Sequence, residues 1–192
     1  MGFNIVTPDQ YRTVPWKNGK GSTLELMVEK CRGEDEFVWR LSMAPVNASG
    51  AFSDFAHYDR TLILVEGNGI TLNHGNGQCD VLKKKFDMAQ FDGGWHTDVV
   101  LQAGDILDFN VMTRQGKCRA QVTLLDQNNS HRLSVNADQL LVYALESDVN
   151  ISPCDSDSFT LPAKHLLCAS SMEPGSWILS GEAVICAQIH LV

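Results

Sequence analysis

Short apolar runs, rich in β-branched and aromatic residues, recur along the chain and are separated by Gly, Asn, Asp and Pro. Such runs are typical of β-strands, and the apolar spacing that marks an amphipathic helix is almost absent. The sequence therefore predicts an all-β protein. Because this many strands must hide their edges, a barrel or a sandwich is favoured. The expected strands are residues 23–28, 37–44, 60–66, 69–73, 106–112, 118–125, 139–144, 158–161, 166–170, 177–180 and 183–191.

Glycine-containing segments between these runs predict hairpin turns, since glycine readily adopts the positive φ that tight hairpins require. These segments are Glu66–Gly69, His74–Gly77 and Ser180–Glu182. The stretch 126–138 is markedly polar and is predicted to be a linker. It would join a larger N-terminal half, residues 1–125, to a smaller C-terminal β half, residues 139–192.

The chain is acidic, with 15 Lys and Arg residues against 23 Asp and Glu residues and a formal net charge of −8. A protein that binds a phosphate backbone needs a broad cationic surface, and the basic run Lys83–Lys85 stands alone. Nucleic acid is therefore not expected as a partner. The apolar runs are far shorter than the roughly 20 residues that cross a bilayer, so no membrane span is expected either.

The N-terminal residues lack the basic start and apolar stretch of a signal peptide, which predicts a cytoplasmic protein. The six cysteines are widely spaced, a pattern that fits neither a zinc site nor a small disulfide framework. We expect them to be reduced thiols.

Three of the expected strands carry polar residues on one face, because side chains alternate across a strand. For example, Arg40 and Ser42 lie opposite Trp39 and its apolar neighbours. A solvent-facing polar stripe is ordinary in an antiparallel sheet, whereas in a small barrel the same face lines the interior, where polar groups can orient a ligand. The polar positions are Thr23, Glu25, Arg40, Ser42, Asp108 and Asn110.

The six histidines lack the close spacing that lets two imidazoles reach one ion, so no metal and no cofactor are expected. His96 and Asp98 form the only close pair and would need a third ligand from elsewhere. Motifs for a nucleophilic serine or a phosphate loop are also missing. Acid–base chemistry by Glu25 and Asp108 stays open, since two carboxyl groups in one buried site can differ in pKa.

Residues Trp16–Glu25 resemble the opening motif of the HutD/Ves family, a Trp-x-Asn-Gly-x-Gly-x-Thr-x-Glu pattern. Five further segments match family motifs in order, and the matches together cover residues 16–114. They are Phe37–Ala44, Gly50–Phe55, Asp59–Arg60, Leu64–Gly69 and Asp108–Arg114. Beyond residue 120 the resemblance rests on length and strand rhythm.

The resemblance implies a cupin-like β-barrel or sandwich with two stacked halves, found in bacteria and often linked to histidine utilisation. It further implies a metabolite-binding, regulatory protein. The ligands it suggests are small carboxylates such as urocanate or formylglutamate, and a related branch of the family is linked to stress. A homodimer is compatible with this prediction.

Strand alternation and the family motifs converge on Thr23, Glu25, Arg40, Ser42, Arg60, Asp108 and Asn110. The candidate ligand-binding residues are these seven together with Trp16, Asn18 and Trp39. Arg40, Arg60 and Asn110 are expected to bind a carboxylate, because the guanidinium fork matches carboxylate geometry. Asp108 would hold an arginine or accept a hydrogen bond from the ligand. Trp16 or Trp39 would supply an apolar wall.

Other interpretations of the same residues remain. Arg40 with Glu25 or Asp108 could be a structural ion pair, and Asn18 with its neighbouring glycines could set a turn at the rim of the site. The competing functions are a metal-independent enzyme that uses Glu25 or Asp108 as acid or base, and an interaction module with solvent-facing stripes.

Overall fold

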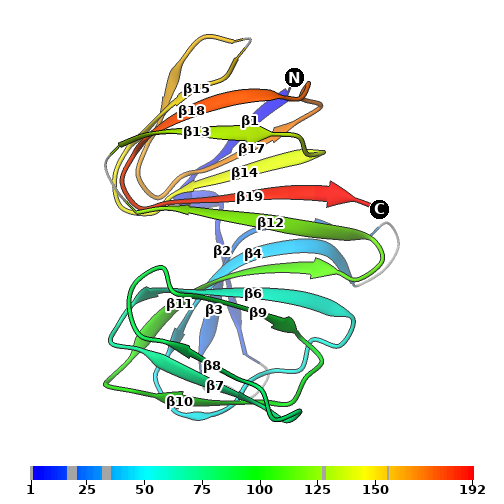
Figure 1. The fold of residues 1–192 in the computed structure, drawn as a ribbon, viewed down its shortest axis with the longest axis vertical. Helices are drawn as coiled ribbons and strands as arrows, with labels where there is room; N and C mark the ends of the chain where they lie inside the picture. Colours follow the sequence, from blue (N-terminus) through cyan, green and yellow to red (C-terminus); the bar gives the residue numbers. More distant parts are fainter. Residues whose placement is uncertain (1, 17–20, 32–35, 127–128, 155) are drawn as a thin grey trace. The chain divides into compact units, whose positions relative to one another are not determined.

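The computed structural model describes residues 2–16, 21–31, 36–126, 129–154 and 156–192. Within them, strands make up nearly all of the regular structure, and the one helical element is a 3-10 turn, η1 (Pro8–Gln10). The predicted all-β class is confirmed (Figure 1). The chain forms two compact units, Arg12–Cys118 and a second unit of Met1–Tyr11 with Arg119–Val192.

The unit Arg12–Cys118 consists of a six-stranded and a four-stranded antiparallel sheet. The six-stranded sheet has the order β2 (Arg12–Pro15), β3 (Ser22–Lys30), β4 (Phe37–Val46), β11 (Ile106–Arg114), β6 (Tyr58–Glu66) and β9 (Met88–Asp92). The four-stranded sheet has the order β5 (Gly50–Ala51), β10 (Thr97–Leu101), β7 (Ile70–His74) and β8 (Cys79–Leu82). Their facing side chains, among them Leu62, Leu72 and Val99, form one buried apolar core.

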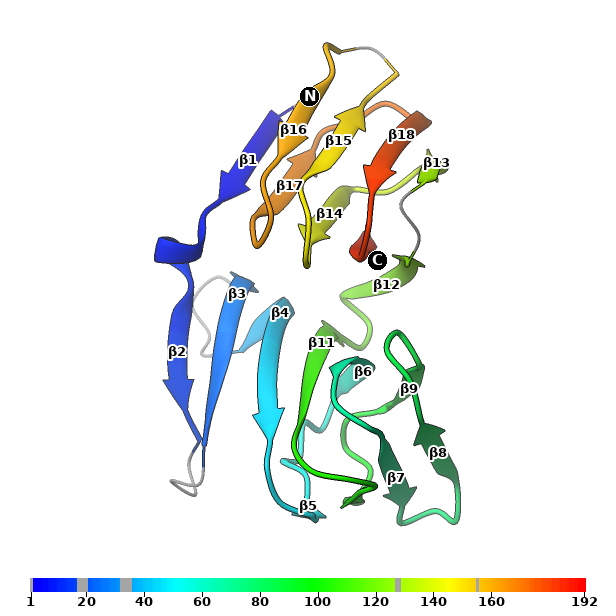
Figure 2. The ribbon, with the colours of Figure 1, turned by 90° about the vertical axis from the view of Figure 1, so that its left-hand side faces the viewer.

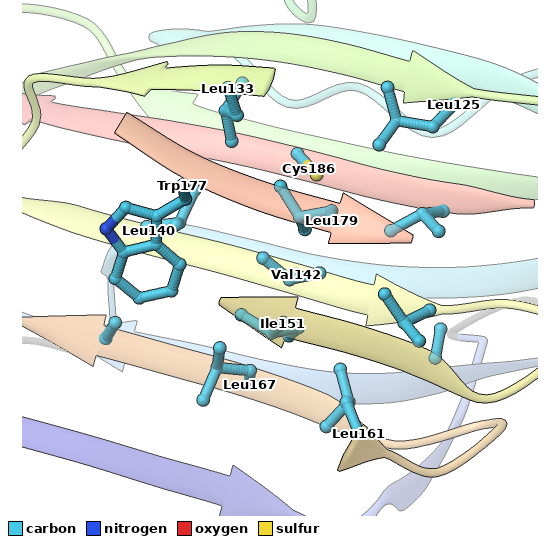
Figure 3. Close-up of a cluster of buried hydrophobic side chains, with 14 of the residues drawn as sticks. Leu125, Leu133, Leu140, Val142, Ile151, Leu161, Leu167, Trp177, Leu179 and Cys186 are labelled. Atoms are coloured by element: carbon cyan, nitrogen blue, oxygen red, sulfur yellow. The ribbon is translucent and has the colours of Figure 1, made fainter. Parts of the chain in front are cut away.

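The second unit also pairs two sheets. One has the order β1 (Gly2–Val6), β17 (Leu166–Ser170), β14 (Gln139–Ala144), β19 (Val184–Leu191) and β12 (Cys118–Leu125). The other has the order β13 (Asn129–Val135), β18 (Gly175–Gly181), β15 (Val149–Ser152) and β16 (Phe159–Leu161). Figure 3 shows the core of this unit, in which Trp177, Leu179 and Val142 are fully buried. Apolar side chains fill this core.

The division of the chain differs from the sequence-based one at two points. Residues 129–135, placed in a linker by their polarity, form β13, which pairs with β18 over seven residues. The N-terminal strand β1 pairs with β17 and so belongs with the C-terminal residues (Figure 2). Polarity misled the prediction because β13 alternates exposed polar residues with the buried Leu133 and Val135.

All eleven expected strands are present, with ends that shift by a few residues. The turn prediction holds at Gly67, Gly69 and Gly77, which have positive φ. At the third predicted turn the positive φ belongs to Ala183 and not to Gly181.

Candidate functional site

The polar stripes of β3, β4, β11 and β6 lie on one face of the six-stranded sheet, the face that also carries the apolar core of the unit. Cross-strand register shows this directly, because directly paired residues project from the same side of a sheet. Met112 of β11 pairs with Arg40 on one side and with Arg60 on the other. In the next row Asn110 pairs with Ser42, which in turn pairs with Glu25. We call Glu25, Arg40, Ser42, Arg60, Asp108 and Asn110 the inner polar cluster.

Arg60, Asn110 and Asp108 form a buried hydrogen-bonded chain within the inner polar cluster. Arg60 Nε donates to Asn110 Oδ1 at 2.8 Å, and Asn110 Nδ2 donates to Asp108 Oδ1 at 2.6 Å. All three residues are buried, with Asp108 only 1% exposed. Among the described residues no group hydrogen-bonds to the second carboxylate oxygen, Asp108 Oδ2.

Arg40 and Glu25 form the second charged pair. Arg40 Nε lies 3.0 Å from Glu25 Oε2, and the two side chains are 12% and 15% exposed. The Nε–H is not aligned for a hydrogen bond, so this contact is an ion pair held by charge. A β-bulge between Glu25 and Met27 shifts the register of β3 and brings Val28 opposite Arg40. Without the bulge, strand alternation would put Val28 on the face opposite to Glu25.

Burial changes the acidity of both charged members of the chain. It raises the pKa of Asp108 to about 6, although the Arg60 charge, the hydrogen bond from Asn110 and the nearby Ala44 backbone act in the opposite direction. Burial also lowers the pKa of Arg60 to about 10, with Asp108 opposing and Arg40 reinforcing the change. Arg60 is therefore charged near neutral pH, while Asp108 can exchange a proton there.

Two phenylalanines supply the apolar environment of Arg60. The Arg60 guanidinium lies 4.7 Å from the ring centroid of Phe52 and 5.5 Å from that of Phe91. Phe91 also pairs directly with Arg60 across β6 and β9. Neither phenylalanine was among the predicted ligand-binding residues, although Phe52 stands inside the Gly50–Phe55 motif and could have been found there.

The two predicted tryptophans lie in different places. Trp39 is fully buried on the opposite face of the sheet from Arg40, as strand alternation requires, so it cannot line the inner polar cluster. Trp16 Nε1 donates to Thr23 Oγ1 at 2.9 Å, which ties the indole to β3. Thr23 shares a face with Glu25, so Trp16 adjoins that end of the cluster. Asn18 lies outside the described residues.

The described residues contain no group of three or more His, Cys, Asp or Glu side chains that could hold a metal ion. His74 is buried, and both of its ring nitrogens are occupied, by Thr97 Oγ1 at 2.9 Å and by Asp80 Oδ2 at 3.0 Å. His96 Nε2 lies 3.2 Å from Asp98 Oδ2 on the surface. None of the six cysteines forms a disulfide. Within the described ranges, no helix has the length and apolar character needed to cross a membrane.

Comparison with known proteins places this arrangement in a family. The HutD family profile matches residues 8–187. A 21.2 kDa protein from the hutC 3′ region of Pseudomonas putida is 34% identical over 150 residues, which cover 78% of this chain and 77% of that protein. The protein Ves of Cronobacter sakazakii is 34% identical over 113 residues, 58% of this chain and 61% of the relative.

Two solved structures resemble the fold along its whole length. The conserved protein of unknown function PA5104 from Pseudomonas aeruginosa PAO1 has a TM-score of 0.87 and 32% identity, and the match covers 99% of this chain and 100% of that one. HutD from Pseudomonas fluorescens SBW25, in a structure described as its formate condition, has a TM-score of 0.85 and 24% identity, with both chains fully covered. The expected cupin-like fold is thereby confirmed. The chain belongs to the HutD family, a cupin-like family associated with histidine utilisation.

Proposed function

We propose that this protein binds a small carboxylate metabolite at the inner polar cluster and acts as a regulatory protein of histidine utilisation in the cytoplasm. The observation that carries the proposal is the burial of the Arg60 guanidinium together with the hydrogen-bonding capacity that remains on it. Its buried guanidinium contacts two aromatic rings, and its Nε–H donates to Asn110 Oδ1. Within the described residues its terminal Nη groups make no hydrogen bond or ion pair. Two parallel N–H groups in such a setting suit a carboxylate.

Arg40 adds a second positive charge from the neighbouring strand pair. The register places Arg40 and Arg60 on either side of Met112, on the same face, so both can contribute to one anion site. Urocanate and formylglutamate are the ligands we propose first, because both are carboxylates of histidine breakdown. The family membership and the relative from the hutC region support the pathway.

Calorimetric titration with urocanate, formylglutamate and histidine tests the proposal. Wild type should bind at least one of them. Arg60→Ala should bind it roughly 30-fold or more weakly, since removing one partner of a buried charge pair costs about 2 to 5 kcal/mol. Arg60→Lys, which keeps the charge but loses the fork, should also bind more weakly than wild type.

Arg132→Ala is the matched control. Arg132 is exposed on β13 and donates to Ser176 Oγ at 3.2 Å, within the unit that does not contain the inner polar cluster. This variant should bind as wild type does. Circular dichroism establishes which variants are folded. If folded Arg60→Ala binds the ligand as tightly as wild type, the carboxylate site is not at Arg60.

A further inference from the structure

The charges of the inner polar cluster sum to zero when every group is ionised. The positive charges are Arg40 on β4 and Arg60 on β6, and the negative charges are Glu25 on β3 and Asp108 on β11. On the other strands of the two sheets, Arg12 of β2 pairs with Glu25 but is exposed to solvent, which screens its charge. His74 of β7 has its ring nitrogens held by Thr97 and by Asp80 of β8, which together form a separate polar group. A ligand that places one carboxylate in the cluster therefore leaves the cluster with one uncompensated negative charge, which is costly where burial limits solvation.

Asp108 can compensate that charge by taking up a proton on its carboxylate. Asn110 must turn its Oδ1 toward the Arg60 Nε–H, so its Nδ2 faces Asp108 and donates to Oδ1. Oδ1 is thus engaged as an acceptor whichever state Asp108 adopts. The oxygen that can take a proton is Oδ2, which is buried and has no hydrogen-bond partner among the described residues.

We propose that binding of a carboxylate at the inner polar cluster is coupled to the uptake of one proton from solvent at Asp108 Oδ2. The proton restores the zero net charge that the ligand disturbs, and no other group has to change its ionisation. This inference rests on the proposed function, because it concerns the same site and the same class of ligand.

The acidity of Asp108 supports the coupling and sets its direction. Its pKa is about 6 without ligand, and a neighbouring ligand carboxylate raises it further because like charges disfavour ionisation. At pH 7 the free protein is mostly deprotonated at Asp108, and the bound protein is protonated. Affinity should therefore fall as the pH rises above about 6, by up to about 10-fold per pH unit, and should change little below it.

Calorimetry of wild type with formate and with formylglutamate tests the coupling. Neither probe carries a group that titrates between pH 6 and pH 8, since ordinary carboxyl groups titrate near pH 4. Each titration is run at pH 7 in two buffers that differ in ionisation enthalpy. The difference between the two apparent enthalpies gives the number of protons exchanged. We expect close to one proton taken up per ligand bound, together with weaker binding at pH 8 than at pH 7.

Asp108→Asn removes the titrating group and keeps an acceptor for Asn110. Its binding should show no proton uptake and no dependence on pH between 6 and 8. Asp98→Asn, at a side chain that is 55% exposed on β10, is the control and should behave as wild type does. The wild-type measurement decides the question even if Asp108→Asn does not fold.

The outcomes separate the two proposals. Carboxylate binding by wild type without proton uptake overturns the coupling and leaves the proposed function standing. Proton uptake that persists in folded Asp108→Asn also overturns it, since another group would then be the acceptor. Failure of wild type to bind formate, formylglutamate, urocanate or histidine at any pH overturns both.

Discussion

Asn110 connects the two oppositely charged residues of the inner polar cluster through one side-chain amide. A primary amide offers both an acceptor and donors, so it can accept from Arg60 and donate to Asp108 at the same time. An aspartate at this position could accept from Arg60 but, when ionised, could not donate to Asp108. Strand alternation could predict that these residues share a face. It could not predict the hydrogen-bonded chain, because that depends on side-chain rotamers.

Asp108 should make the stability of the protein depend on pH. Its pKa is raised from 3.8 to about 6 on folding, so between these values the folded protein keeps a proton that the unfolded chain has released. The contribution of this residue to stability is fully present below about pH 4 and is lost as the pH rises through about 6. The loss between pH 5 and pH 7 should be about 1 kcal/mol, with little change above pH 7.

Urea unfolding of wild type and Asp108→Asn between pH 5 and pH 8 measures this effect. The free energy of unfolding of the variant minus that of wild type should increase from pH 5 to pH 7 and then level off. Taking this difference removes the contribution of the other titrating groups, which both proteins share. Asp105→Asn, at an exposed side chain of the same unit, serves as a control. A difference that stays constant from pH 5 to pH 8 would show that Asp108 keeps an ordinary pKa in the folded protein.

At the scale of whole strands, the apolar pattern of the sequence predicted more of the strands than it missed. The strands 118–125, 139–144 and 166–170 were predicted with the bounds that the structure shows. The bulge in β3 was not predicted, because an extra residue inside a strand leaves no mark in the apolar pattern. The short strands β8 and β10 were also missed, since four or five residues give too few alternations to stand out.

The hairpin turns allow a prediction about which glycines matter most. Gly67, after β6, has a φ of +102°, and an added Cβ would lie 2.6 Å from both Asp105 O and Ile106 Cγ2. Gly77, after β7, has a φ of +87°, but no atom lies within 4 Å of its added Cβ. Gly77→Ala should therefore cost about 1 kcal/mol of stability for the backbone conformation alone. Gly67→Ala should cost a further 1 to 3 kcal/mol or so, because the backbone must also move.

Chemical denaturation of the two alanine variants beside wild type measures both losses. The comparison is matched, since each change adds one methyl group at a positive-φ glycine of a hairpin in the same unit. Equal losses of stability in the two variants would mean that the Asp105–Ile106 segment moves to accommodate the added methyl group without a loss of free energy.

At the scale of the whole chain, the boundary between the units was the least predictable feature. Polarity suggested a boundary between the units at residues 126–138. In the structure, however, β1 pairs with β17, so the N-terminal residues belong to the same unit as the C-terminal residues. This pairing joins residues 2–6 to residues 166–170, and local patterns carry no information on contacts between such distant parts of the sequence. Similarly, Phe3 packs edge-on against Trp177, with ring centroids 5.7 Å apart.

Deleting residues 2–6 should therefore weaken the C-terminal unit. The deletion removes β1, which pairs with β17 from Gly2 opposite Ser170 to Val6 opposite Leu166. It also removes the ring contact between Phe3 and Trp177. The amides of β17 that point toward β1 should lose protection from hydrogen exchange by at least about 10-fold, because they lose their acceptors to solvent. Amides of β4 should keep their protection. Removal of Val192 alone, which is 86% exposed, is the control and should change neither strand. If the deletion instead opens β4 and leaves β17 protected, β1 belongs with the N-terminal half, as a boundary at residue 125 would require.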